Sequence, residues 1–218
     1  MTTADPAGHG VAQVYALLAA GRAFDARRLA DTQVGAHPGD PSVLVAAAQA
    51  HEGTGDLAGA CALLGSALAA APERPHTLQV ASIVYLQARR FDEALDLGRR
   101  LVALDPANGE AQAHLAALMY DAQGWYGRRM VKQARPIALE AVRLAPTSAH
   151  AHHVLGLIEL NLGRRSDARH HFDQALALDP QHADLHLTRS YATGIGRDGR
   201  AARAEAVDAA TALAPNAE

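Results

Sequence analysis

The sequence has few cysteine and aromatic residues and no long apolar run. Of its 218 residues one is cysteine, and aromatic residues make up 4%. Because Cys61 stands alone, an intramolecular disulfide and a multi-cysteine zinc site are excluded, and a reducing compartment is the simpler expectation. The amino terminus lacks the segments of a signal peptide, and no apolar run reaches the roughly 18 residues of a membrane span. We therefore expect a cytoplasmic protein without direct membrane insertion.

The sequence also lacks a large excess of positive or negative charge, and it lacks catalytic motifs. The formal net charge is -3, from 20 basic and 23 acidic residues, so there is no general field that would gather nucleic acid. The sequence contains no glycine-rich phosphate loop, no Gly-x-Ser-x-Gly elbow and no strand pattern for a dinucleotide fold. We predict that the chain is not an enzyme, holds no cofactor and does not bind nucleic acid.

What is present is a large apolar fraction and a regular spacing. Apolar residues make up 49% of the chain, and with so few aromatics the core must consist of Ala, Leu and Val, which favours closely packed helices. The prolines recur at intervals of 34, 34, 40, 34 and 35 residues: Pro38, Pro72, Pro106, Pro146, Pro180 and Pro215. Since proline averages about 5% of residues, this spacing indicates a repeat architecture.

The segment between Pro146 and Pro180 shows what one repeat contains. Apolar residues at helical spacing define two faces, the first with Val154, Leu155, Ile158 and Leu162, the second with Ala168, Phe172, Ala175 and Leu176. Between them, Gly163 can end one helix in the left-handed conformation, and Ser166 or Asp167 can cap the next. Each repeat is therefore predicted to be a helix-turn-helix.

The same segment resembles the tetratricopeptide-repeat family. The family's Leu, Gly, Ala, Phe, Ala and Pro positions are occupied here by Leu155, Gly156, Ala168, Phe172, Ala175 and Pro180. His152 and Glu159 replace the family's Trp and Tyr. The resemblance implies an all-α fold, a right-handed α-solenoid of tandem helix-turn-helix repeats.

One register covers nearly the whole chain. It gives a short tail, 1–6, and a single domain, 7–215, with repeats at about 7–38, 39–72, 73–106, 107–146, 147–180 and 181–215. A column of alanines follows this register: Ala26, Ala60, Ala94, Ala134, Ala168 and Ala202. Because such repeats are stable only when stacked on their neighbours, we expect one domain. The last repeat lacks a further capping helix, so its own second helix acts as the cap, the chain is part of a longer one, or it forms a homo-oligomer through this uncapped repeat.

The fourth repeat carries a six-residue insertion, expected at the turn around Asp121 to Lys132. The loop at 123–132 holds the single tryptophan, Trp125, followed by Tyr126, Arg128 and Arg129. The two aromatic residues either fold back as a lid on neighbouring helices or form a partner-binding anchor, since Trp, Tyr and Arg are enriched at interface hot spots. Pro136 is expected to begin the second helix late or to kink it.

The family resemblance also implies a concave groove, lined by the first helix of each repeat, that receives a peptide or partner segment. The residues placed there by the register, and predicted as partner-binding, are Tyr15, Gln49, His76, Gln79, Ile83, His114, His150, His153, Leu157 and Tyr191. The Lys, Arg and Asn side chains with which some members grip a terminal carboxylate are missing from this groove. An alternative is that several of these residues are simply solvated and that the useful surface is an edge or the convex side.

Histidines are concentrated in the last two repeats. His150 and His153 are three residues apart, and His182 and His186 are four apart, spacings that can bring two imidazoles to one metal ion on a helix. No companion carboxylate stands at a fixed spacing, so we predict solvated or groove-lining histidines and no metal site. The function predicted overall is a protein-interaction scaffold or adaptor. The alternative is an accessory or regulatory module of an enzyme or membrane complex whose activity lies on another chain or an extension.

Overall fold

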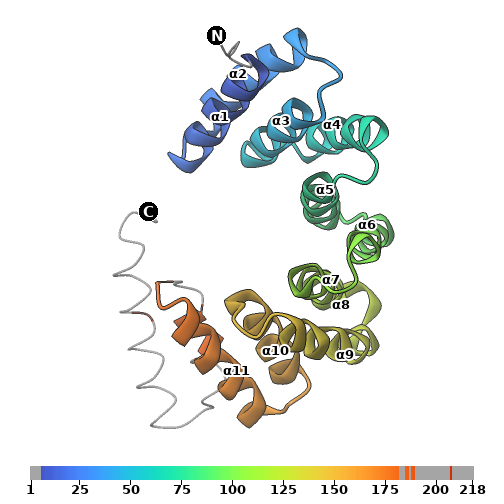
Figure 1. The fold of residues 1–218 in the computed structure, drawn as a ribbon, viewed down its shortest axis with the longest axis vertical. Coiled ribbons are helices and arrows are strands. Elements are labelled where there is room, and N and C mark those ends of the chain that lie inside the picture. The colour runs from blue at the N-terminus through green and yellow to red at the C-terminus, as the bar shows by residue number, and fades with distance from the viewer. Residues whose placement is uncertain (1–5, 182–184, 187, 190–206, 208–218) are drawn as a thin grey trace. The chain divides into compact units, whose positions relative to one another are not determined.

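The computed structural model describes residues 6–181, 185, 186, 188, 189 and 207, and this part of the chain consists of helices joined by short turns (Figure 1). Its helices are α1 (Pro6–Ala19), α2 (Ala23–Ala36), α3 (Pro41–Gly53), α4 (Leu57–Ala70), α5 (Pro75–Gln87), α6 (Phe91–Leu104), α7 (Gly109–Asp121), α8 (Gln123–Tyr126), α9 (Arg128–Leu144), α10 (Ala149–Asn161) and α11 (Arg165–Leu178). No strand occurs among these residues, and none of these helices has the length and apolar character needed to cross a membrane.

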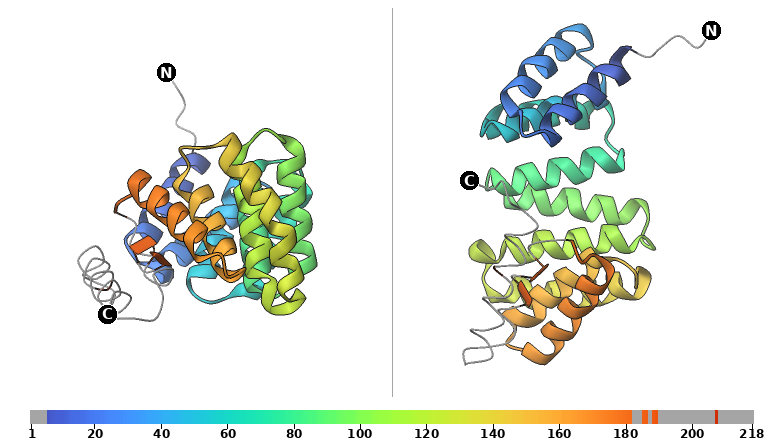
Figure 2. Two further views of the ribbon diagram at one scale, coloured as in Figure 1. Left: turned by 90° about the horizontal axis from the view of Figure 1, so that it is seen from below. Right: turned by 90° about the vertical axis from the view of Figure 1, so that its left-hand side faces the viewer.

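The helices pack in successive pairs, as the repeat register predicts. Each first helix lies against the second helix of its own repeat: α1 with α2, α3 with α4, α5 with α6, α7 with α9, and α10 with α11 (Figures 1 and 2). The all-α repeat fold is thereby confirmed. The sixth predicted repeat, with Ala202, Tyr191 and the uncapped end, lies almost wholly outside the described residues.

The chain divides into two compact units, residues 1–104 with α1 to α6 and residues 105–218 with α7 to α11. In the first unit α1 contacts α3 and α3 contacts α5, while in the second α7 contacts α10. First helices of successive repeats therefore form a layer within each unit. The prediction of one continuous domain stays a prediction.

Local sequence accounts for most helix boundaries. α3 and α5 begin at Pro41 and Pro75, as expected of proline at the first helical position. Asp40 accepts a hydrogen bond from the backbone N–H of Ser42 at 2.8 Å and caps α3. At the turns within repeats, the backbone φ angle is positive at four equivalent positions: Gly21 (71°), Gly55 (82°), Arg89 (61°) and Gly163 (85°). The third repeat therefore places an arginine where the others use glycine.

Small residues form the contact between paired helices. The alanine column is fully buried, with 0% exposure at Ala26, Ala60, Ala94, Ala134 and Ala168. In the fifth repeat Gly156 packs directly against the ring of Phe172, which is also fully buried. Because neither alanine nor glycine holds the helix axes apart, the pairs pack closely with few aromatic residues.

Two local predictions were wrong. The second helix of the fifth repeat begins at Arg165 with Arg164 at the N-cap, so neither Ser166 nor Asp167 caps it. In the fourth repeat, 123–132 is not a loop: residues 123–126 form α8, and α9 begins at Arg128 and runs through Pro136 instead of starting late. Proline removes one backbone donor, whereas Val131, Ala134 and Ala138 are buried along α9. Burial of this apolar stripe outweighs the lost hydrogen bond.

Candidate interaction surfaces

The predicted groove residues of the first unit lie on its first helices. Tyr15 on α1 and His76 on α5 contact each other, with 3.5 Å between the hydroxyl and Nε2. Burial raises the pKa of Tyr15 and lowers that of His76. On α5, Gln79 is exposed and Ile83 is 39% exposed, whereas Gln49 on α3 is half-buried. The structure thus brings Tyr15 and His76 together and leaves Gln79 and Ile83 accessible.

In the second unit, two predicted groove residues line one cavity. His150 and His153 share a cavity of about 400 Å³ with the carboxylates of Glu110 and Asp179; Thr147, Ser148, Ala149 and Leu185 complete its wall. His114 lies beneath this surface with 7% exposure, and burial, followed by the neighbouring His150, lowers its pKa to about 4. Such a histidine is neutral at physiological pH.

The remaining groove predictions have different surroundings. Leu157 packs against the buried Ala168 and Phe172 and so belongs in part to the core. Tyr191 lies outside the described residues. His152 on α10 and His171 on α11 approach each other, with 3.2 Å between their Nδ1 atoms. His182, one of the histidines singled out by helical spacing, lies outside the described residues. Within the described residues, His, Cys, Asp and Glu side chains nowhere gather in threes as metal ligands.

The insertion is fixed to the neighbouring repeat. Asn161, at the end of α10, donates from its side chain to the Gln123 side chain at 2.6 Å. Arg128 donates to the backbone carbonyl of Asn161 at 3.0 Å. Between these two tethers, Trp125 on α8 is 65% exposed and Tyr126 is half-buried. Trp125 is therefore largely exposed on an anchored segment.

The insertion forms part of a basic pocket, which is defined by Arg128, Arg129, Lys132, Arg135, Leu162 and Arg164 and has a volume of about 660 Å³. The first four residues come from α9 and the last two from the turn between α10 and α11. Glu159, 1% exposed, accepts from Arg135 at 2.7 Å and lies 3.7 Å from Arg164. One buried carboxylate thus pairs with or lies near two of the five cations that line the pocket.

The sequence interpretation found Arg128 and Arg129 but missed the rest of this pocket. Arg128, Lys132 and Arg135 are four and three residues apart, the spacing of one helical face. That signal was present in the sequence, but it has meaning only on a helix, and the segment was predicted to be a loop. No spacing in the sequence connects Arg164 with the α9 cations, because Arg164 follows α10 and reaches them only through the packing of α10 on α9.

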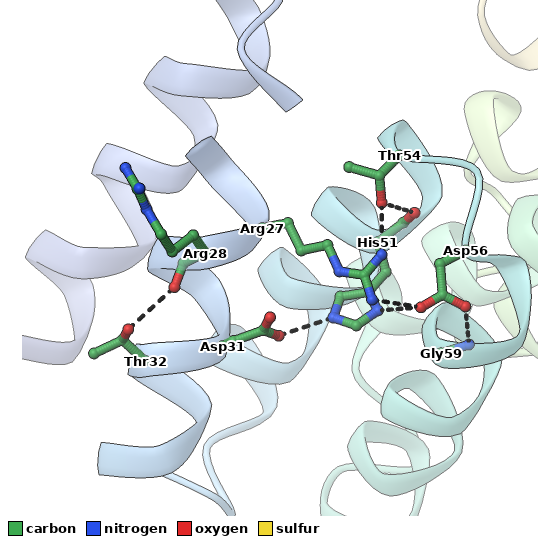
Figure 3. Close-up of polar contacts among 8 residues, drawn as sticks. All are labelled: Arg27, Arg28, Asp31, Thr32, His51, Thr54, Asp56 and Gly59. Carbon is green, nitrogen blue, oxygen red and sulfur yellow. Dashed lines mark hydrogen bonds and ion pairs between the residues drawn. The ribbon is translucent and has the colours of Figure 1, made fainter. Parts of the chain in front are cut away.

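A second polar cluster, also missed, joins α2 to the α3–α4 turn (Figure 3). His51 lies between two carboxylates, 2.9 Å from Asp31 and 3.0 Å from Asp56. Arg27 donates to Asp56 at 2.8 Å, and Asp56 also accepts the backbone N–H of Gly59 at 2.9 Å. The Gly59 hydrogen bond is the main reason that the pKa of Asp56 is lowered, followed by its bond with His51. The cluster caps α4 and connects successive repeats.

The fold defines a class of protein, the helical-repeat proteins. Residues 149–182 match the tetratricopeptide-repeat family model. The predicted resemblance to the tetratricopeptide-repeat family is confirmed. No curated protein matches the sequence.

Solved structures with the same fold extend the likeness to most of the chain. A thermophilic tetratricopeptide-repeat protein of Thermus thermophilus is 23% identical with a TM-score of 0.70, over 82% of this chain and 93% of its own. A chain from the APC/C hetero-tetramer Cut9-Hcn1 is 15% identical with a TM-score of 0.71, over 96% of this chain and 40% of its own. YrrB, a tetratricopeptide-repeat protein with an unusual peptide-binding site, is 20% identical with a TM-score of 0.51, over 86% of this chain and 93% of its own. At these identities the likeness concerns the fold.

Proposed function

We propose that the chain is a cytoplasmic scaffold that binds a segment of a partner protein at the edge formed by its insertion, residues 123–132. The observation that carries this proposal is Trp125, a large aromatic side chain 65% exposed on a segment that two hydrogen bonds hold to α10. An aromatic residue beside arginines is the composition of an interface hot spot.

Anchoring matters because binding costs conformational entropy. A side chain on a mobile loop must be ordered when the partner arrives, whereas one on a held helix has already lost part of that freedom. Gln123 and Arg128 flank Trp125 in sequence, and both are bonded to Asn161. The insertion can therefore present Trp125 to a partner with little further ordering.

Proteins of the same fold support a binding role. YrrB has a peptide-binding site, and the Cut9-Hcn1 chain was solved in a hetero-tetramer. An accessory module of an enzyme or membrane complex would use the same surface to attach to the chain that carries the activity. The two possibilities differ in the identity of the partner and share the prediction of where it binds.

The cavity of the second unit is a second candidate surface for a partner segment. His150 and His153 line it together with two carboxylates, Glu110 and Asp179. These side chains offer both hydrogen-bond donors and acceptors to a peptide. We propose this cavity as the part of the predicted groove to test separately in this unit.

The test is affinity capture from extracts of the organism that encodes the chain, followed by titration with the purified partner. Trp125→Ala should weaken partner binding by roughly 30-fold, as for a hot-spot residue worth about 2 kcal/mol. Phe24→Ala is the matched control, because Phe24 is an aromatic residue with 79% exposure on α2.

Loss of the partner in a His150→Ala, His153→Ala variant, with Trp125→Ala unaffected, would move the site to the cavity of the second unit. Each variant is first shown by circular dichroism to be folded. Failure of the wild-type chain to retain any protein partner would overturn the scaffold proposal.

A further inference from the structure

The basic pocket, to which the insertion contributes Arg128, Arg129 and Lys132, is electrostatically unfavourable in the free chain. Arg128 and Lys132 are separated by one helical turn on α9, as are Arg129 and Lys132 and again Lys132 and Arg135. Like charges at these spacings destabilise a helix. Arg128 and Arg129 also lie in the first turn of α9, which contains no acidic residue and where the helix dipole disfavours cations.

The charges of the pocket are only partly compensated. Glu159 pairs with Arg135 and lies near Arg164, and Arg128 is bonded to a neutral carbonyl. Among the described residues, no ion pair includes Arg129 or Lys132, and both are exposed. The positive charge is local, because the chain as a whole carries a formal charge of -3.

We infer that the pocket binds an acidic segment of the partner protein, whose Asp or Glu carboxylates pair with Arg128, Arg129 and Lys132. This inference rests on the proposed scaffold function and specifies the partner's chemistry. Guanidinium groups bind carboxylates through two parallel hydrogen bonds. Leu162 adds an apolar wall to the pocket, which suits a segment that mixes acidic and aliphatic residues.

The form of the charged surface favours a peptide over nucleic acid. The cations are gathered around one cavity of about 660 Å³, a size that holds a few side chains. A nucleic acid carries regularly spaced phosphates and binds best to an extended basic stripe or groove. A compact set of cations beside an exposed tryptophan is better matched by one short acidic segment.

A substitution at Glu159 tests the inference by an expected gain of binding. The Glu159 carboxylate is buried behind the pocket and pairs with the lining residue Arg135 at 2.7 Å, so it neutralises part of the positive charge that an incoming carboxylate would meet. Glu159→Gln keeps the shape of the side chain and removes its charge. The variant should therefore bind an acidic peptide several-fold more tightly than the wild type, whereas a pocket with a purely structural role would show no gain.

The experiment uses the full chain and fluorescence anisotropy of labelled hexaglutamate, with hexaglutamine and an oligouridylate RNA as comparison probes. Wild type should bind hexaglutamate saturably, more weakly at high salt, and should not bind hexaglutamine. Arg129→Glu with Lys132→Glu should weaken binding by at least about tenfold, because charge pairs at the site are replaced by repulsion. Arg99→Glu with Arg169→Glu changes the net charge equally on exposed helix positions outside the pocket and should bind as wild type does.

Equal weakening by both double variants would show a general charge effect and overturn the inference, as would absence of saturable hexaglutamate binding. Tighter binding of RNA than of hexaglutamate, lost in the Arg129→Glu, Lys132→Glu variant, would replace the acidic segment by nucleic acid. If that variant still retains the captured partner while Trp125→Ala loses it, the scaffold function stands and the pocket inference fails.

Discussion

Gly156 sits where α10 comes closest to the ring of Phe172. A Cβ atom at this position would lie 2.5 Å from a ring carbon, and the ring is fully buried and cannot move aside. We expect Gly156→Ala to lower the free energy of unfolding by about 1–3 kcal/mol through overpacking. The control is Gly65→Ala on the exposed side of α4, where the nearest atom is 3.9 Å away and alanine should add about 0.5–1 kcal/mol. Urea denaturation measures both, and an unchanged Gly156→Ala midpoint would contradict the packing.

Arg89 adopts a left-handed backbone conformation, with φ of 61°, that its equivalents leave to glycine. Its guanidinium also lies 5.5 Å from the ring centre of Phe91. Both Arg89→Gly and Arg89→Ala remove the contact with Phe91. A difference in stability between these two variants therefore reports only the cost of the left-handed backbone conformation. We expect the glycine variant to be more stable than the alanine variant by about 1 kcal/mol.

At Arg99, an exposed position inside α6, the order should reverse, because glycine is about 1 kcal/mol less favourable than alanine inside a helix. Thermal unfolding of the four variants is the measurement. The same order at both positions would show that Arg89 is not strained.

Burial of His114 should make stability depend on pH. Its ordinary pKa of 6.5 falls to about 4 in the folded chain, chiefly because burial disfavours the charged form. Between these values the unfolded chain binds more protons, so the stabilisation is complete above about pH 6.5 and is lost as the pH falls toward 4. The change should amount to about 2–3 kcal/mol.

Denaturation at pH 7.5 and pH 5 should show a smaller difference in His114→Gln than in the wild type. Part of the dependence will remain, because burial also lowers the pKa of His171 to about 4. His9→Gln, an exposed substitution on α1, should retain the wild-type difference. An unchanged pH dependence in His114→Gln would contradict burial of a neutral imidazole.

At the scale of the element, helix caps decide where each helix begins. Ser148 accepts the backbone N–H of Ala151 at 3.0 Å and caps α10, so Ser148→Ala should cost about 1 kcal/mol. Ser166 was predicted to cap α11 but lies inside it, exposed. Ser166→Ala should therefore be nearly neutral. Chemical denaturation distinguishes the two serines, and equal losses would contradict the observed start of α11.

One physical cause explains why sequence reasoning described the segment that forms α8 and the start of α9 incorrectly. Segment 123–132 contains Gly124, Gly127 and, soon after, Pro136, which favour a turn when local preferences alone are considered. Val131 and Ala134 find buried positions against the rest of the repeat, and this tertiary contact stabilises a helix through the proline. Local helix propensity could not predict that α9 runs through Pro136, because the residues that bury Val131 and Ala134 come from other segments of the chain.

At the scale of the whole molecule, the contacts among the described helices join helices of one repeat or of successive repeats. Stability in such arrays is a sum of local terms. Leu64 in the first unit and Leu155 in the second are both fully buried, and replacing either by alanine should cost about 2–5 kcal/mol. We expect Leu64→Ala to speed amide hydrogen exchange mainly in residues 1–104 and Leu155→Ala mainly in residues 105–181. Uniform loss of protection from either substitution would indicate cooperative unfolding of the whole chain.

The sequence by itself determined the repeat. The proline period, the alanine column and glycines such as Gly55 and Gly163 act locally, through backbone conformation and the size of a side chain, so they can be recognised without coordinates. Tertiary structure decided the surfaces. It brought Arg164 and the α9 cations to one pocket, placed His152 beside His171 and buried His114. Charge, accessibility and pKa depend on which atoms surround a group, and those neighbours are supplied by helices far apart in the sequence.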